Sequence, residues 1–262
     1  MSGAVVAAAE RFVEEFMGRY DCSHDWHHVQ RVVRQALALA RAEARSKPVD
    51  VLVVQLAALL HDVDDAKYQQ EGDTPFSSAR FLAGAGLDEA RAAAVARIID
   101  AVSFRKELLA EEQDRLGTSS PADRAWRRDC VELACVQDAD RLDAIGAFGV
   151  LRCAAFSGAR GRPLHDPSDV AIADITYEQY VGERCGKGGT AVAHFHEKLL
   201  RLASMMKTEP GRQEAQRRRA FMCQFLDQLD GEYAFGAKTD QVATAGPQDQ
   251  DGPGGSPGQT AQ

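Results

Sequence analysis

One stretch decides the fold: Val-Asp-Val-Leu-Val-Val-Gln-Leu-Ala-Ala-Leu-Leu-His-Asp, residues 49–62. As a helix, its first twelve residues are apolar on nearly every face, which is typical of a helix in a protein core. The helix leads directly into His61 and Asp62. Burying a carboxylate beside an imidazole costs free energy unless something compensates, and a metal ion bound to both groups would do so. The alternative is a hydrogen-bonded His-Asp pair at an ordinary helix end.

The rest of the chain also shows helical periodicity, and no stretch alternates in the manner of a strand. Alanine, leucine, arginine and glutamate are abundant and favour helix. The sequence therefore predicts an all-α fold of about eight or nine helices. They are expected at Ala4–Gly18, Asp25–Arg45, Val49–Leu60, Pro75–Ala83, Asp88–Phe104, Asp129–Val136, Arg141–Phe156, Gly188–Met206 and Gly211–Gly231.

Two further stretches are expected to be loops. Gly117–Arg124 contains Gly-Thr-Ser-Ser-Pro, and Gly158–Tyr180 is rich in Gly, Pro, Asp and Ser and long enough to form a lid. Residues 236–262 hold almost no large apolar side chains, so they cannot bury enough surface to offset their ordering entropy. We therefore expect one folded domain over residues 1–235 and a disordered tail over 236–262.

The composition narrows the class of protein. The 262 residues are 45% apolar and 27% charged, with a net charge of −8 at pH 7, which argues against a general nucleic-acid binder. No secretory signal and no apolar run of the ~20 residues needed to span a membrane is evident. The six cysteines are scattered without metal-binding spacing. We expect a cytoplasmic protein with reduced thiols and no membrane partner.

A second polar stretch is Ser23-His24-Asp25-Trp26-His27-His28-Val29, which places three histidines within five residues. Asp25 is suited to cap the helix that follows. His28 lies inside that helix beside its apolar stripe, which makes it the better candidate ligand. His24 is four residues earlier and so on the same face if the helix starts early enough. A polar helix start with solvated imidazoles is the alternative.

A third stretch, Gln137-Asp138-Ala139-Asp140-Arg141-Leu142-Asp143, places three carboxylates among apolar anchors. Acids so close repel one another unless a cation or Arg141 relieves them. A capping cluster between two helices would account for the pattern equally well.

Together these stretches resemble the HD-domain metal-dependent phosphohydrolases. The motifs His-Asp-Trp-x-His-x-x-Arg-Val, Leu-Leu-His-Asp-Val-x-Asp-x-Lys-Tyr and Gln-Asp-Ala-Asp-Arg-Leu-Asp-Ala-Ile-Gly are similar to the small bacterial-type branch implicated in nucleotide pyrophosphohydrolysis. Two later segments agree with it, Ser103–Arg105 and Thr190–Leu199.

The resemblance implies a single divalent ion held by His28, His61, Asp62 and Asp140. Asp140 is preferred to Asp138 because the ligand of the superfamily directly precedes the Arg/Lys-Leu pair, and Asp138 is left as a residue behind the ligands. Two imidazoles and two carboxylates suit Mn²⁺ best, with Mg²⁺, Fe²⁺, Co²⁺ and Zn²⁺ as alternatives. His27 beside His28 leaves open which histidine binds, and His24 or His27 is a candidate extra ligand.

Substrate-handling residues follow from the same resemblance and from spacing. Lys67 is the leading candidate to bind phosphate, with Arg105 and Lys106 as further candidates. Asp65, four residues after His61, is placed to orient or deprotonate the attacking water. His194 and Lys198, also four residues apart, are candidates to line the pocket. For each, the alternative is structural: a solvated lysine, a helix cap or a packed histidine.

The predicted function is hydrolysis of a small phosphate compound, preferably a nucleoside triphosphate cleaved to monophosphate and pyrophosphate. Alternatives are a nucleotide monophosphatase, a cyclic-nucleotide phosphodiesterase, a non-catalytic nucleotide sensor and a di-iron oxygenase. The sequence leaves the oligomeric state open, a homodimer included.

Overall fold

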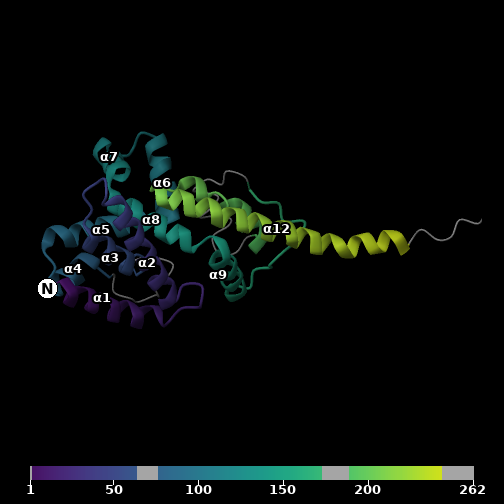
Figure 1. Ribbon diagram of the computed structural model, residues 1–262, viewed down its shortest axis with the longest axis horizontal. Coiled ribbons are helices and arrows are strands. Elements are labelled where there is room, and N and C mark those ends of the chain that lie inside the picture. Colours follow the sequence, from purple (N-terminus) through teal and green to yellow (C-terminus); the bar gives the residue numbers. More distant parts are fainter. Residues whose placement is uncertain (1, 64–75, 173–188, 244–262) are drawn as a thin grey trace, which may run out of the picture. The chain divides into compact units, whose positions relative to one another are not determined.

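The computed structural model describes residues 2–63, 76–172 and 189–243, the side chains as far as residue 235. All the regular secondary structure of these residues is helical, and they contain no strand, which confirms the all-α prediction. The chain divides into two compact units, Met1–Cys223 and Gln224–Gln262. The first unit holds every helix except the C-terminal part of the last one (Figure 1).

Three mutually packed helices form the centre of the first unit: α2 (Trp26–Glu43), α3 (Val51–Leu60) and α8 (Val131–Asp143). Seven of the ten residues of α3 are buried, as the apolar pattern predicts. Asp50 begins α3 by accepting hydrogen bonds from the backbone N–H groups of Leu52 and Val53 at 3.1 and 3.2 Å. Asp25 caps α2 in the same way. The two caps fix where each helix starts, and hence where its histidine lies.

Three more helices lie in this half of the chain (Figure 1): α1 (Ser2–Met17) and α5 (Glu89–Val102) pack on α3, and α4 (Ser78–Gly84) packs on α5. The rings of Phe12, Phe76 and Phe81 pack together between α1 and α4, with centroids 4.8 to 5.7 Å apart. The predicted helices in this half of the chain are all present, with ends that differ by up to three residues.

Two helices are missing from the predictions, α6 (Phe104–Arg115) and α7 (Pro121–Asp129). Helix α6 is polar on most faces and buries only Phe104 and Leu108, so its apolar periodicity is weak. The loop predicted at 117–124 is shorter than expected, because Ser120 caps α7 and Pro121 occupies its first turn.

The predicted break within the acidic stretch is wrong. Helix α8 continues through Asp138 and Asp140 to Asp143, and α9 (Gly146–Ala159) starts after a short turn. The turn lies at Gly146, whose φ of 75° favours glycine. The acids do not interrupt the helix because each has its own partners in the tertiary structure, which the sequence pattern does not reveal.

The predicted single helix at 188–206 is also wrong. It consists of α11 (Ala191–His194), a π-helical turn η3 (Phe195–Leu199) and a 3₁₀ turn η4 (Leu202–Met205). Before it, residues 160–172 carry no helix, and residues 173–180 of the expected lid lie outside the described residues. The lid therefore stays a prediction.

Helix α12 (Glu209–Ala243) extends eight residues beyond the predicted end of the folded domain, and residues 244–262 lie outside the described residues.

The five described cysteines are free, and Cys185 is not among them. No single described helix is long and apolar enough to cross a membrane; α8 and α9 pass that test only as a pair bent by 69°.

Candidate metal centre

The four predicted ligands meet where α2, α3 and α8 pack together. His28 is in the first turn of α2, His61 is the C-terminal cap of α3, Asp62 follows it, and Asp140 lies in the last turn of α8. Two imidazoles and two carboxylates from three separate parts of the chain therefore face one another.

The distances match a site shared by one cation. Nε2 of His28 lies 3.3 Å from Oδ2 of Asp62 and 3.8 Å from Oδ1 of Asp140. Nε2 of His61 lies 3.4 and 3.7 Å from the same two oxygens. One ligand atom each from His28, His61 and Asp140 lies within 4.8 Å of the others. Bonds of about 2 Å to a central ion would span such separations.

Solvent reaches the site from one side only among the four residues, at the carboxylate of Asp140. His28 is fully buried, and His61 and Asp62 are nearly so. The side chain of Asp140 retains 29% of its exposure to solvent. A ligand from solvent would therefore reach the site past Asp140.

Both histidines present Nε2 toward the cluster because their Nδ1 atoms are engaged behind it. Nδ1 of His28 lies 2.7 Å from Oδ2 of Asp143, and Nδ1 of His61 lies 2.9 Å from the carbonyl oxygen of Ala58. A carbonyl or carboxylate oxygen accepts, so each Nδ1 carries the hydrogen. In the neutral rings, each Nε2 then holds a lone pair, as a metal ligand requires.

The two Nε2 atoms supply the test of whether a metal fits. Among the described residues, neither atom has a hydrogen-bond partner, although both are buried. Buried polar atoms without a partner are rare because their desolvation is uncompensated. A cation between the histidines and the carboxylates would satisfy both nitrogens, so the residues present fit a divalent ion.

The electrostatics of the metal-free cluster point the same way. Burial lowers the pKa of His61, but the carboxylates of Asp62 and Asp140 outweigh that effect and raise the pKa to about 9. Burial raises the pKa of Asp140, and the neighbouring histidines, His61 first, reverse this and bring it well below its usual range. The pocket is thus built to hold positive charge, from a proton or from a metal.

Comparison with known proteins gives the family. The model of the HD domain matches residues 25–145, a range that contains all four residues. The uncharacterized protein YpgQ of Bacillus subtilis is 34% identical over 220 residues, which are 84% of this chain and 89% of YpgQ. The chain belongs to the HD-domain superfamily.

Solved structures of similar proteins have the same fold. A crystal structure from Lactobacillus plantarum matches with a TM-score of 0.69 and 32% identity, over 87% of this chain and 96% of that one. YpgQ in complex with ADP matches with a TM-score of 0.61 and 29% identity, over 88% and 96%. An HD-superfamily hydrolase from Bacillus thuringiensis matches with a TM-score of 0.58 and 28% identity, over 89% of this chain and 98% of that one.

The other two histidines of the HD motif have different surroundings. His27 is exposed, and its Nδ1 lies 3.2 Å from Oε1 of Gln30 on the outside of α2. It is therefore not part of the cluster. His24 precedes α2, with its ring centroid 5.9 Å from that of His28 and its Nδ1 2.7 Å from Oγ of Ser23. Of the two, only His24 borders the cluster.

Asp138 belongs to the packing of the HD domain and not to the surroundings of the ligands. It is fully buried, and its carboxylate accepts hydrogen bonds from the backbone N–H groups of Lys207 and Thr208 and from the Thr208 hydroxyl, at 2.7 to 3.0 Å. These bonds hold the turn that starts α12. The expectation that Asp138 lies behind the metal ligands is therefore not supported by its contacts.

The residue that does lie behind a ligand is Asp143, to which the sequence analysis gives no role. It is buried, and besides His28 it contacts Arg31, whose Nε and Nη2 lie 2.7 and 3.0 Å from its two oxygens. Arg152 adds a contact at 3.3 Å. Burial raises the pKa of Asp143, but these partners, His28 and Arg31 first, lower it to about 2. The spacing offers a signal: Asp143 is three residues after Asp140, and Arg31 three after His28.

The predicted substrate residues at the start of α6 differ in their surroundings. Arg105 is exposed in the first turn. Nζ of Lys106 turns back onto α5, 3.4 Å from the carbonyl oxygen of Ile99 and 3.6 Å from Oδ1 of Asp100. This contact accounts structurally for Lys106. Substrate binding by either residue stays a prediction.

His194 and Lys198 lie at the junction of α11 and η3. Nζ of Lys198 lies 5.0 Å from the ring centroid of Phe104, so the two later motifs of the sequence meet in space. Burial, together with the nearby charges of Lys198 and Arg162, lowers the pKa of His194 to about 3. His194 is therefore neutral at pH 7. The other two predicted residues, Asp65 and Lys67, lie outside the described residues.

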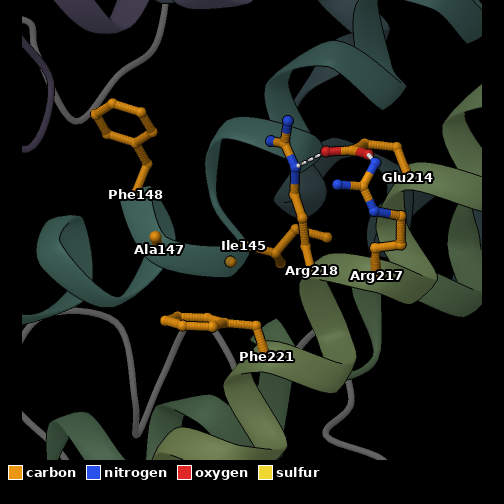
Figure 2. A pocket seen from close by; sticks show the side chains of 8 residues that line it. Ile145, Ala147, Phe148, Glu214, Arg217, Arg218 and Phe221 are labelled. Carbon is orange, nitrogen blue, oxygen red and sulfur yellow. Dashed lines mark hydrogen bonds and ion pairs between the residues drawn. The ribbon is translucent and has the colours of Figure 1, made fainter.

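Two surface pockets lie elsewhere on the first unit. One, of about 300 Å³, is lined by Ile145, by the first three residues of α9 and by residues of α12. In Figure 2 Arg217 and Arg218 both reach Glu214, at 2.9 and 2.8 Å. The other, of about 540 Å³, contains Arg160, Arg162, Asp166 and Asp169, so its charges balance. Neither pocket includes a predicted metal ligand.

Proposed function

We propose that this chain is a divalent-metal-dependent hydrolase of small phosphate compounds, with a nucleoside triphosphate as the preferred substrate and a monophosphate and pyrophosphate as products. The observation that carries the proposal is the pair of buried Nε2 atoms of His28 and His61, which have no hydrogen-bond partner among the described residues and face the carboxylates of Asp62 and Asp140. The HD-domain match supports the same reaction class.

The four side chains would hold the ion, with Mn²⁺ as the proposed metal because two imidazoles and two carboxylates suit it. A bound divalent ion lowers the pKa of coordinated water and polarises a phosphoryl oxygen. Asp140, the most exposed of the four, borders the side from which substrate would arrive. Asp65 is proposed to accept the proton of the attacking water.

A polyphosphate needs further positive charge, because Asp62 and Asp140 offset the charge of the ion. We assign this role to Lys67 first, and then to Arg105, Lys106 and Lys198, with neutral His194 as a hydrogen-bond donor. The YpgQ complex with ADP supports a nucleotide as the ligand class.

The test is an assay of the full chain with Mn²⁺ against a panel of nucleoside tri-, di-, mono- and cyclic monophosphates, with pyrophosphate and orthophosphate resolved. Pyrophosphate and monophosphate from triphosphates support the proposal. Orthophosphate from monophosphates, or opening of cyclic nucleotides, would instead assign a phosphatase or a phosphodiesterase. Nucleotide binding without any product would assign a sensor, and oxygen consumption with two irons per chain an oxygenase.

Two variants separate the proposed roles of the residues near His61. Lys67→Met is expected to raise KM for a triphosphate with a smaller effect on kcat, and Asp65→Asn to lower kcat. Lys47→Met is a matched control, because Lys47 is exposed and pairs with Glu43 at 2.9 Å. If Lys67→Met and Lys47→Met have the same KM as wild type, Lys67 does not bind substrate.

A further inference from the structure

Asp143 is a buried carboxylate whose oxygens face donors from two other helices. Oδ2 lies 2.7 Å from Nδ1 of His28, and Oδ1 lies 2.7 Å from Nε of Arg31. Nη2 of Arg31 and Nη1 of Arg152 contact Oδ2 at 3.0 and 3.3 Å. Both arginines are held in turn, since Arg31 stacks 4.3 Å from the Phe148 ring centroid and Arg152 donates to the Ser23 carbonyl at 2.6 Å.

We propose that Asp143 is a positioning residue that locks the ring of His28, with Nδ1 protonated and Nε2 aimed at the metal site. The inference rests on the proposed function, because the metal is what Nε2 would bind. It concerns a residue that touches neither the substrate nor the metal and acts only through His28.

The hydrogen-bond chemistry fixes the direction of the contact. Two guanidinium groups, which can only donate, already lie on the oxygens of Asp143. The carboxylate is therefore the acceptor toward His28, and the hydrogen lies on Nδ1. A ring flip or the other tautomer would break this buried bond and turn the lone pair away from the site. Metal-binding histidines commonly have such a partner on the second nitrogen, which also makes the metal-binding nitrogen more basic.

The two histidines of the site are unequal in this respect. His61 donates to a neutral carbonyl oxygen, that of Ala58, whereas His28 donates to a charged carboxylate that two arginines hold in place. Hydrogen bonds to charged acceptors are roughly twice as strong as neutral ones. We therefore expect His28 to be the more firmly oriented of the two.

Asp138 provides a matched control on the same helix. It is as buried as Asp143, but its carboxylate binds the start of α12 through Thr208 and Lys207. Asp143→Asn is expected to weaken Mn²⁺ binding, measured by calorimetry, by about 10- to 100-fold, the range found for such outer partners. Asp138→Asn is expected to lower thermal stability and to leave Mn²⁺ affinity close to wild type.

A spectroscopic measurement reads the ring itself. The measurement is NMR of wild type labelled with ¹⁵N-histidine, recorded with and without Zn²⁺, and comparison with His28→Gln identifies the His28 signals. These signals should show that Nδ1 carries a hydrogen that exchanges slowly with solvent. Asp143→Asn should lose that slow exchange, while His61 keeps its own. If Asp143→Asn does not fold, Arg31→Lys is a milder second variant, because it keeps the positive charge but loses the two-point contact with Asp143. We expect it to lose less Mn²⁺ affinity than Asp143→Asn.

The outcomes are distinguishable from a failure of the proposed function. If wild type binds no metal, the hydrolase proposal fails, and the metal-free spectrum still decides whether Asp143 sets the ring. An unprotonated Nδ1 of His28 in wild type would overturn the inference. So would Mn²⁺ affinities of wild-type strength in both folded Asp143→Asn and Arg31→Lys.

Discussion

The imidazole rings of His28 and His61 lie with their centroids 5.3 Å apart and their planes at 68° to each other. They come from the start of one helix and the end of another, so the crossing of α2 and α3 brings them together. The arrangement turns both Nε2 atoms toward the carboxylates of Asp62 and Asp140.

Asp62→Ala is expected to reduce phosphohydrolysis to background while leaving the helical circular-dichroism signal intact. Asp62 follows the end of α3 and faces both histidines, so its loss removes one of the four proposed ligands and no part of a helix. Asp166→Ala, a change of an acidic residue far from α3 in sequence and exposed to solvent, is the control. Activity of wild-type level in Asp62→Ala would show that the cluster is not the active site.

Metal affinity should rise with pH, because the ion must displace the proton of His61. The pKa of that ring is raised to about 9 in the metal-free cluster, so the proton is present at pH 7 and largely absent above pH 9. The association constant should grow by about tenfold per pH unit over this range and then level off. Anaerobic Mn²⁺ titrations in two buffers of different ionisation enthalpy would count the proton released. A flat profile between pH 7 and 9 would contradict the assignment.

His194 should make the free energy of unfolding depend on pH on the acid side. Its pKa falls to about 3 in the folded chain from an ordinary value of 6.5. The unfolded state therefore binds the proton first, and stability drops as pH falls below 6.5, by up to about 1.4 kcal/mol per unit. The measurement is urea unfolding of wild type and His194→Gln between pH 4 and 7. Parallel curves for the two proteins would show that His194 is not responsible.

Gly211→Ala should destabilise the fold without removing any functional group. A Cβ atom at this position would lie 2.6 Å from Oδ2 of Asp138 and 2.6 Å from Oγ1 of Thr208. Overpacking of this kind costs about 1–3 kcal/mol. The control is Gly158→Ala, because a Cβ there would meet nothing within 4 Å. Thermal unfolding should separate the two variants, and equal melting temperatures would contradict the predicted clash.

The helical periodicity of the sequence is sufficient for the all-α class, and the resemblance to the HD motifs is sufficient to name four residues that the structure brings together. The sequence is insufficient where tertiary partners override local pattern. Asp138 and Asp140 suggest a helix break, yet α8 continues through both. Asp138 accepts a hydrogen bond from the Thr208 hydroxyl, and Asp140 faces His28 and His61. Helix α6 has too little apolar periodicity to be predicted. Asp143 is not predicted because two of its partners, His28 and Arg31, lie 115 and 112 residues away in the chain.

Asp138 and Asp140 lie two residues apart on α8, but their partners come from different parts of the chain. Asp140 faces His28 and His61, which precede α8, and the partners of Asp138 follow it. The segment matched by the HD model ends at residue 145, but the groups that satisfy Asp138 belong to Lys207 and Thr208. A chain shortened to residues 25–145 would lack these groups. The buried Asp138 carboxylate, in the same part of α8 as Asp140, would then lose its hydrogen-bond donors. We therefore expect a fragment of residues 25–145 alone to aggregate, and the similarity to YpgQ, which covers 84% of this chain, likewise extends beyond the residues that the HD model matches.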